Sequence, residues 1–154
     1  MIKSAFTMIE LIFAIVIIGI LAAIAVPKLM VTRDDAIYVK GKSQLSSIKS
    51  GITMQKSKNM LRGITNSGSY YPTKLDNYYP TEQQYLFYFG DGNSSNILES
   101  PIYPKKSQGY WWESNSTTYH YFVSDDKNVT FTYNPQTGSF DCDHTQQECK
   151  NLAE

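Results

Sequence analysis

Residues 6–26, FTMIELIFAIVIIGILAAIAV, decide the fold of this chain, and Pro27 and Lys28 follow them. The segment contains one charge, Glu10, and every residue from 11 to 26 is apolar or glycine. As a helix rising 1.5 Å per residue, it would span roughly 30 Å, about the hydrocarbon thickness of a bilayer. The sequence therefore predicts a hydrophobic transmembrane or assembly helix over residues 6–27.

Three kinds of segment fit this composition: a secretory signal, an ordinary membrane anchor and a helix that assembles with other helices. Residues 23–25, Ala-Ile-Ala, would serve as a signal cleavage site. Glu10 does not suit a signal or an anchor, because a carboxylate inside the bilayer costs on the order of several kcal/mol unless it is paired, protonated or near the interface. Glu10 therefore favours a segment that assembles with a partner whose positive charge pairs with the carboxylate.

Residues 5–11, AFTMIEL, resemble the processing site of type IV prepilins and type II secretion pseudopilins. In that family a dedicated peptidase cuts before the Phe and methylates the new amine, which here places the cut between Ala5 and Phe6. The residue before the cut is usually Gly, so Ala5 departs from the pattern. The resemblance implies that the carboxylate of Glu10 pairs with the N-terminal amine of a neighbouring subunit. It also makes residues 1–5 a leader peptide.

Gly19 and Pro27 are the candidate kink positions of this helix. Pro27 lacks an N–H and crowds the preceding turn, so we expect it to kink the helix. Gly19 lowers helix propensity, although a small residue here would equally suit close helix packing. Both residues fall where the pilin family places a helix-softening glycine and proline.

The helix is expected to continue through residues 28–63 as an amphipathic segment. Apolar residues and one glycine recur at spacings of four, four, three and four, which makes one stripe on a helix: Ile37, Gly41, Leu45, Ile48 and Ile52. A basic residue followed by glycine at positions 62 and 63 predicts the end of the helix. The whole helix would therefore run for about 55 residues, which is too long for one compact domain.

Residues 64–154 are expected to form a globular head. Residues 64–109 have no clear periodicity and predict an ordered connecting loop with short helical or strand pieces. Alternating side chains at 119–123 and 129–133, with turn sequences at 125–128 and 135–138, predict antiparallel strands. The fold class is therefore α+β and pilin-like: a long N-terminal helix whose upper half packs on a sheet of three or four strands.

The charges are divided between the two regions. Residues 28–62 carry eight Lys/Arg against two Asp, a net charge of +6, and residues 63–154 carry five Lys against eleven Asp/Glu, a net charge of −6. A solvated basic helix face explains this division, and so does attraction between the helix of one subunit and the head of another.

The orientation in a membrane is a conflict between two signals. The positive-inside rule would place the Lys-rich side after residue 28 in the cytoplasm. Two cysteines seven residues apart favour an oxidising compartment instead, and the rule weakens for long translocated segments. We expect the head to lie outside the cytoplasm, as the family resemblance also implies.

Cys142 and Cys149 are the only cysteines in the chain. A disulfide between them would close an eight-residue loop and contribute roughly 2–3 kcal/mol. The alternatives are free thiols and a metal site that includes Asp143 and His144, although this spacing fits no familiar zinc pattern. A C-terminal disulfide loop resembles that of many type IV pilins and is absent from most major pseudopilins.

Four aspartates near the predicted turns could hold Ca²⁺ through carboxylate oxygens: Asp125, Asp126, Asp141 and Asp143. Major pseudopilins use a C-terminal calcium site, but this sequence lacks the glycine-aspartate loop expected there. Acidic turn residues usually serve the turn alone, so we expect no metal and no cofactor.

Three positions match the Asn-x-Ser/Thr acceptor of N-glycosylation, and each has Asp or Glu two residues earlier: Asn93, Asn115 and Asn128. This pattern resembles the extended acceptor site of bacterial N-linked glycosylation. The alternative is that Asp and Asn cluster because both favour turns.

The sequence does not support an enzyme. Neither His120 nor His144 belongs to an arrangement of the triad type, and no phosphate-binding loop is present. The basic helix with Tyr38 is a candidate strip for binding nucleic-acid backbone, but its apolar face is committed to packing. Contact with DNA is therefore expected through an assembled filament rather than the subunit.

The predicted function is a structural subunit of a type IV-like pilus used in adhesion, motility or DNA uptake. The alternatives are a pseudopilin of a type II secretion system and, in a different class, a membrane-anchored binding module outside the cytoplasm. The resemblance implies a bacterial inner-membrane protein that enters a filament after cleavage. Its partners would be other subunits, the prepilin peptidase, the inner-membrane assembly platform, the membrane and DNA through the filament.

Overall fold

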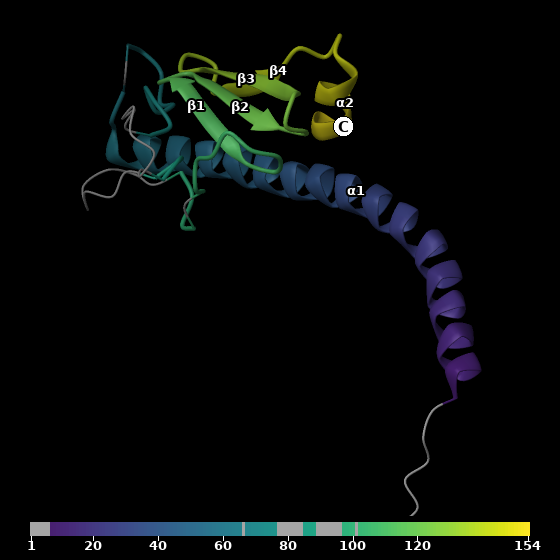
Figure 1. The fold of residues 1–154 in the computed structure, drawn as a ribbon. Helices are drawn as coiled ribbons and strands as arrows, with labels where there is room; N and C mark the ends of the chain where they lie inside the picture. The colour runs from purple at the N-terminus through teal and green to yellow at the C-terminus, as the bar shows by residue number, and fades with distance from the viewer. Residues whose placement is uncertain (1–6, 66, 77–84, 89–96, 101) are drawn as a thin grey trace, which may run out of the picture. The chain divides into compact units, whose positions relative to one another are not determined.

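The computed structural model describes residues 7–65, 67–76, 85–88, 97–100 and 102–154, without the side chains of residues 25–32. The chain divides into two compact units, Met1–Ala36 and Ile37–Glu154. Its elements follow one another along the chain (Figure 1): α1 (Met8–Arg62), β1 (Trp111–Asn115), β2 (Thr118–Phe122), β3 (Asn128–Asn134), β4 (Ser139–Cys142) and α2 (Gln147–Ala153).

Helix α1 contains 55 residues, as the sequence predicts. Gly63 ends it with a φ of 66°, a left-handed conformation that glycine adopts without strain. The N–H of Gly63 donates to the carbonyl of Met60 at 3.2 Å, and the N–H of Ile64 donates to that of Asn59 at 2.9 Å. These two bonds form a Schellman motif, which satisfies carbonyls that the last turn would otherwise leave open.

The four strands form one antiparallel sheet in the order β1-β2-β3-β4. Strand β3 alternates strictly between exposed and buried residues, as expected for a sheet with one face on the core and one on solvent. Tyr119 pairs with Phe131, and Tyr133 pairs with Phe140, so aromatic residues lie opposite one another on the buried face. The α+β class and the antiparallel sheet are confirmed, with four strands.

The buried face of the sheet packs on α1 within the second unit (Figure 1). The predicted stripe supplies the helix side of this core, with Leu45, Ile48 and Ile52 buried and Ile37 partly buried. Gly41 allows the close approach, because a Cβ there would lie 2.6 Å from Cδ2 of Leu152.

Tyrosine and tryptophan side chains join the helix and loop to the sheet. Tyr121 donates its hydroxyl proton to the carbonyl of Ile37 at 2.6 Å, and Trp111 donates its ring N–H to Oε1 of Gln44 at 3.1 Å. Each ring thus adds apolar area to the core while its polar atom finds a partner. The tyrosine-rich composition of the head therefore serves packing.

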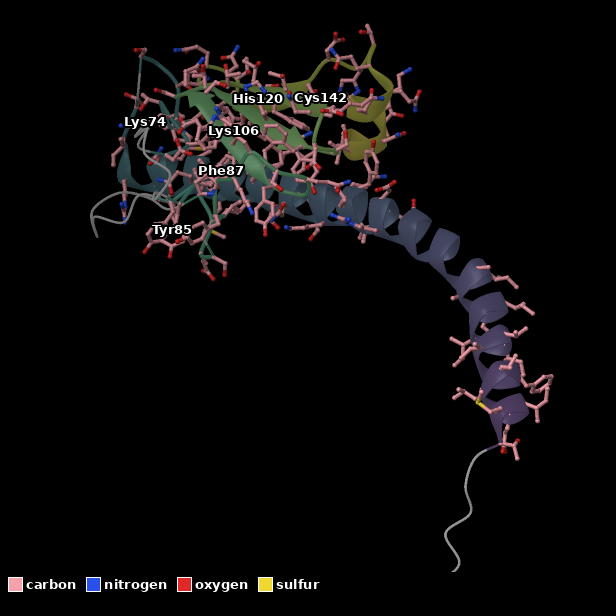
Figure 2. The ribbon with its side chains drawn as sticks, viewed as in Figure 1. Lys74, Tyr85, Phe87, Lys106, His120 and Cys142 are labelled. Atoms are coloured by element: carbon pink, nitrogen blue, oxygen red, sulfur yellow. A yellow bond between two sulfur atoms is a disulfide. The ribbon has the colours of Figure 1, made fainter. Side chains whose placement is uncertain are left out.

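The connection between α1 and β1 contributes buried residues without continuous regular structure in its described parts. Isolated bridges occur there, among them Leu86 with Ile102 and Pro104 with Trp111. Phe87 has a φ of 60°, which is unusual for a bulky residue, and its side chain is fully buried (Figure 2). Its ring stacks on Tyr119 with centroids 4.8 Å apart. The loop thus inserts a side chain into the core.

Helix α2 lies at the C-terminal end of the chain, where the sequence predicts only a disulfide loop. Cys149 and Leu152 are its buried residues. The second helix therefore packs on the core rather than forming a free tail.

Candidate functional site

The N-terminal part of α1 is a helix whose described side chains are exposed on every side. From residue 7 to residue 24 no side chain is buried. The large apolar residues among them are Met8, Ile9, Leu11, Ile12, Phe13, Ile15, Val16, Ile17, Ile18, Ile20, Leu21 and Ile24. A helix that is hydrophobic all round requires burial by something else, because a water-facing helix keeps a polar face. The described residues of the first unit therefore do not bury their own apolar side chains.

Glu10 lies in the first turn of this helix. Its backbone N–H lies 3.1 Å from the carbonyl oxygen of Thr7 and 3.4 Å from the Thr7 hydroxyl, so Thr7 caps the helix. The spacing Thr-x-x-Glu is that of a capping box, a signal that the sequence analysis missed. The Glu10 side chain is exposed, and no described residue forms an ion pair with it. The carboxylate is therefore available to a partner outside the described chain.

The two processing residues, Ala5 and Phe6, lie outside the described residues, as does the predicted leader. In the described part of the chain, no helix is both long and apolar enough to cross a membrane, in contrast to the span predicted over residues 6–27.

Both candidate kink positions lie inside α1. A Cβ added to Gly19 would meet no heavy atom within 4 Å, so nothing in the described chain packs against this glycine. Glycine here is therefore not required by contacts within the subunit. The kink at Pro27 stays a prediction.

A pair of buried carboxyl groups joins the connecting loop to the sheet. Asp76 comes from the loop and is 1% exposed, and Glu113 comes from the inward face of β1 and is 8% exposed. Asp76 accepts hydrogen bonds from the hydroxyl of Tyr119 and from the backbone N–H of Phe87, both at 3.1 Å. A further hydrogen bond joins Asp76 to Glu113. The bond from the N–H of Phe87 thus ties this left-handed loop residue to the buried carboxyl pair.

One proton is shared within this pair. Burial raises the pKa of Glu113 to about 9, and the nearby charge of Asp76 acts in the same direction. Burial also raises the pKa of Asp76, but the hydrogen bonds that it accepts from Phe87, Glu113 and Tyr119 oppose this effect. Glu113 is therefore the protonated member at neutral pH, and Asp76 the charged one. In the sequence, Glu113 stands at the end of a predicted strand and two residues before the sequon Asn115, and neither position indicates a buried, protonated carboxyl group.

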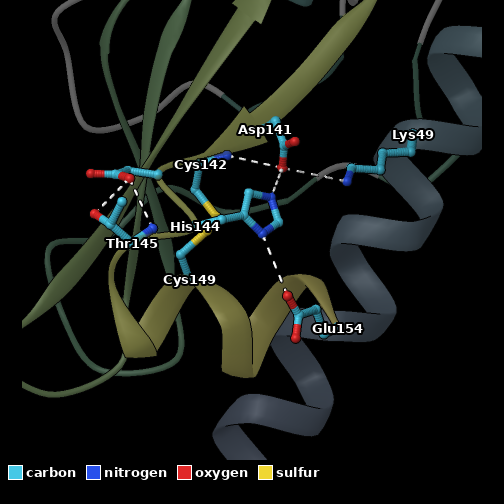
Figure 3. The surroundings of a disulfide bond; sticks show 8 residues. Lys49, Asp141, Cys142, His144, Thr145, Cys149 and Glu154 are labelled. Atoms are coloured by element: carbon cyan, nitrogen blue, oxygen red, sulfur yellow. Dashed lines mark hydrogen bonds and ion pairs between the residues drawn. A yellow bond between two sulfur atoms is a disulfide. The ribbon is translucent and has the colours of Figure 1, made fainter.

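The C-terminal cysteines are joined by a disulfide, Cys142 to Cys149, with Cα atoms 5.9 Å apart (Figure 3). It connects the end of β4 to α2. The bond excludes the alternative in which both thiolates bind a metal. His144 lies beside it, with Nε2 at 3.1 Å from Oδ1 of Asp141 and Nδ1 at 3.7 Å from Oε1 of Glu154.

The four aspartates considered for calcium have other partners or lie apart. Asp143 accepts hydrogen bonds from the backbone N–H and the hydroxyl of Thr145 at 2.9 and 2.8 Å, and these bonds lower its pKa. Asp141 faces Lys49 and His144 (Figure 3). Among the described residues, no three His, Cys, Asp or Glu side chains form a group able to hold a metal ion.

The three sequons differ in their surroundings. Asn93 lies outside the described residues, whereas Asn115 and Asn128 are both exposed. The acid two residues before Asn115 is Glu113, which is buried, and the acid before Asn128 is the exposed Asp126. Asn128 is therefore the described sequon whose acid is accessible.

His120 lies on the outward face of the sheet as a half-buried residue (Figure 2). Its Nε2 is 2.5 Å from the Ser114 hydroxyl oxygen, and its Nδ1 is 3.1 Å from that of Thr130 and 3.3 Å from Oδ1 of Asn128. A hydroxyl beside an oriented imidazole has the form of a catalytic dyad. Because these atoms lie on the outward face of a sheet, we interpret them as a cross-strand polar cluster.

Comparison with known proteins adds two findings. The prokaryotic N-terminal methylation motif matches residues 1–26. The chain is 36% identical over 66 residues to type II secretion system core protein G of Pseudomonas aeruginosa. The aligned segment covers 43% of this chain and 46% of that protein. The chain thus aligns with about half the length of this curated relative. No solved structure matches.

Proposed function

The chain carries the N-terminal methylation motif of type IV pilins and type II secretion pseudopilins, and on this premise we propose that it is a structural subunit of a filament. Proteins of this family are structural subunits rather than enzymes. The proposal includes a first stage in the bacterial inner membrane, with the head outside the cytoplasm. Cleavage before Phe6 would then release the helix for assembly.

The exposed apolar surface of residues 8–24 is the observation that carries this proposal. These side chains surround the helix, and the buried core formed by the described residues of the head includes none of them. A helix that is apolar on all sides is stabilised when its side chains are buried by neighbouring helices. A bundle of copies of this helix would bury them in that way. A filament core supplies that arrangement.

Glu10 gives such a bundle its register. Between apolar helices a lone carboxylate is costly, whereas a carboxylate paired with a neighbour's N-terminal amine is stabilised by the charge of that amine. Each added subunit would therefore be favoured in the position that brings the two groups together. The prepilin peptidase is a required partner in this proposal, because cleavage creates the amine.

Two observations bear on which filament the subunit enters. The disulfide between Cys142 and Cys149 resembles that of many type IV pilins, and most major pseudopilins lack such a bond. The curated relative, by its name, belongs to a type II secretion system. We propose a type IV-like pilus, with a type II secretion pseudopilus as the second candidate.

The experiment compares Glu10→Gln with Glu148→Gln in cells that lack the wild-type chain. Gln has the size of Glu without its charge. Glu148 is a partly exposed glutamate on α2, paired with Lys127 at 3.3 Å on the surface of the head, and serves as the control. We expect at least tenfold fewer sheared filaments from Glu10→Gln, an unchanged amount from Glu148→Gln and equal total protein in both. Normal filaments from Glu10→Gln would rule out the mechanism.

Mass spectrometry of the protein from its own envelope separates the filament subunit from an anchored binding module. A chain that begins at N-methylated Phe6 supports filament assembly. A chain that retains Met1 in cells with an active prepilin peptidase supports the anchored module. The same spectrum, taken without reducing agent, would report the two-hydrogen loss of the Cys142–Cys149 disulfide and the added mass of any glycan on the sequons Asn93, Asn115 and Asn128.

A further inference from the structure

The hairpin that joins β1 to β2 has a sequon at its tip. Asn115 is the last residue of β1, and Ser116 and Thr117 form the turn that leads into β2. Asn115 and Ser116 are exposed, and Thr117 is partly exposed. Strand β1 is an outer strand of the sheet (Figure 1). Exposed loop tips are the parts of a folded domain that other enzymes reach most readily, so the complete sequon is accessible here.

The side chain of Asn115 is held by the third residue of its own sequon. Its Oδ1 accepts hydrogen bonds from the backbone N–H and from the hydroxyl of Thr117, both at 3.1 Å. These bonds form an Asx-turn that includes the hydroxyl required of an Asn-x-Ser/Thr acceptor. The negative charge of a deprotonated amide lies mainly on its oxygen, so both bonds favour loss of a proton from Nδ2. The turn therefore favours the nucleophilic form of the amide nitrogen.

A second turn in the head shows what the turn alone requires. Oδ1 of Asp143 accepts hydrogen bonds from the backbone N–H and the hydroxyl of Thr145 at 2.9 and 2.8 Å. Asp143 thus forms the same turn as Asn115, with a carboxylate in place of the amide. Aspartate would serve the turn equally well at position 115, so the amide nitrogen is the one group that this turn does not use.

The sequon of Asn128 lies within the sheet instead. Asn128 and Thr130 are exposed, but Val129 between them is 1% exposed and pairs with Tyr121 of β2. A transferase that draws this sequon into its own site would have to pull Val129 out of the core and break its strand pairing. Asn128 is therefore an acceptor only in a chain that has not yet folded.

The acids before these two sequons differ in the opposite sense. Glu113, two residues before Asn115, is 8% exposed and hydrogen-bonded to Asp76, whereas Asp126, two residues before Asn128, is exposed. An enzyme that reads the acid cannot reach Glu113 in the folded head. An enzyme that reads only Asn-x-Ser/Thr finds a complete acceptor there at Asn115.

We propose that Asn115 carries an N-linked glycan, added to the folded head by a transferase that does not read the preceding acid, and that Asn128 stays unmodified. In the transfer, Nδ2 of Asn115 attacks the anomeric carbon of a sugar carried on a diphosphate. A carbon–nitrogen bond forms, the bond from that carbon to the diphosphate oxygen breaks, and the diphosphate leaves with the bonding electrons. A base of the transferase takes the proton from Nδ2. Any folded head that the transferase reaches would present the same tip, whether or not the chain enters a filament.

The first test is a tryptic map of the protein from its own envelope, reduced before digestion. Trypsin separates the two sequons, because residues 107–127 contain Asn115 and residues 128–150 contain Asn128. Mass spectrometry should find the added mass of a glycan, with sugar fragment ions, on the first peptide and none on the second. A glycan on both peptides, on the second alone or on neither would overturn the proposal.

The second test uses variants that keep the turn. Asn115→Asp should abolish the glycan on peptide 107–127 and leave the near-UV circular dichroism unchanged, because aspartate forms the same turn without the nitrogen. Thr117→Ser keeps the hydroxyl and should keep the glycan, whereas Thr117→Val should lose it. Glu113→Gln should keep the glycan. A glycan that persists in Thr117→Val or disappears in Glu113→Gln would contradict the proposal.

Discussion

Helix α1 contains two regions that differ in how their apolar side chains are buried. In residues 8–24 every described side chain is at least partly open to solvent, although nearly all are apolar. From Ile37 to Arg62 the same helix keeps a polar side and buries Leu45, Ile48 and Ile52 against the sheet. One continuous helix therefore includes a part whose apolar side chains are buried within the subunit and a part whose apolar side chains stay exposed.

This difference separates stability from assembly. Substitutions in the second region should change the free energy of unfolding of the head, because that region supplies the core. Substitutions in residues 8–24 should leave the head unchanged and alter only what the helix contacts outside the subunit. Substitutions matched between the two regions therefore distinguish an effect on stability from an effect on assembly.

The largest effect is expected from the same substitution made in each region. Ile48 is 0% exposed and Ile15 is 58% exposed. Ile48→Ala should lower the free energy of unfolding of the head by about 2–5 kcal/mol, because it removes buried methyl groups and leaves a cavity. Ile15→Ala should change it by less than about 0.5 kcal/mol. Urea unfolding in non-ionic detergent, followed by tryptophan emission, measures both, and equal effects would contradict the division of α1.

Removal of the disulfide tests whether α2 belongs to the head. The bond between Cys142 and Cys149 closes a short loop, so Cys142→Ser/Cys149→Ser should cost about 2–3 kcal/mol of unfolding free energy. Wild-type protein in reducing agent provides the control and should match the variant. Hydrogen exchange should show loss of protection in Gln147–Ala153 and little change in β2. Unchanged protection in α2 would mean that Leu152 alone holds it.

The carboxyl pair predicts a pH dependence of the head. The folded state keeps a proton on Glu113, whose pKa is about 9, whereas the unfolded chain releases it near the ordinary value of 4.5. Over this interval the unfolded state binds fewer protons, so stability falls as pH rises, by up to about 1.4 kcal/mol per pH unit. Below about pH 4.5 both states bind the proton, and this dependence vanishes.

Glu113→Gln removes this dependence while keeping an N–H donor for Asp76. The variant should exceed wild type in stability by a margin that increases from pH 5 to pH 9, measured by urea unfolding at one-unit intervals. Lys74, Tyr119 and Tyr133 are the other titratable groups that act on this cluster, and they are the same in both proteins. A margin that does not depend on pH would show that Glu113 is ionised in the folded state.

The architecture was accessible from the sequence because its signals are local and periodic. The stripe Ile37, Gly41, Leu45, Ile48 and Ile52 predicted the packed face of α1, and glycine at 63 predicted its end. Alternation with a period of two placed β2 and β3 within one residue of their observed bounds. Patterns of this kind depend on neighbours in the chain, which the sequence contains.

The features that sequence reasoning missed depend on contacts between distant residues. Asp76 and Glu113 are 37 positions apart, and nothing near either residue indicates that both carboxyl groups are buried. Phe87 likewise resembles its exposed neighbour Tyr85 in sequence and differs from it only in the fold. Helix α2 is seven residues long, which is too short for a periodic signal.

The smallest expected effect on the free energy of unfolding comes from a charged residue on α1. Lys49 and Asp141 form an ion pair at 3.8 Å between α1 and β4, with side chains 44% and 46% exposed. Because solvent screens such a pair, Lys49→Met should lower the free energy of unfolding by less than about 1 kcal/mol, and 1 M salt should remove the difference. Lys58→Met, at an exposed lysine that forms no ion pair among the described residues, is the control. If Lys49→Met instead reduces filament yield with an unchanged head, the basic face of α1 serves contacts between subunits rather than contacts within one.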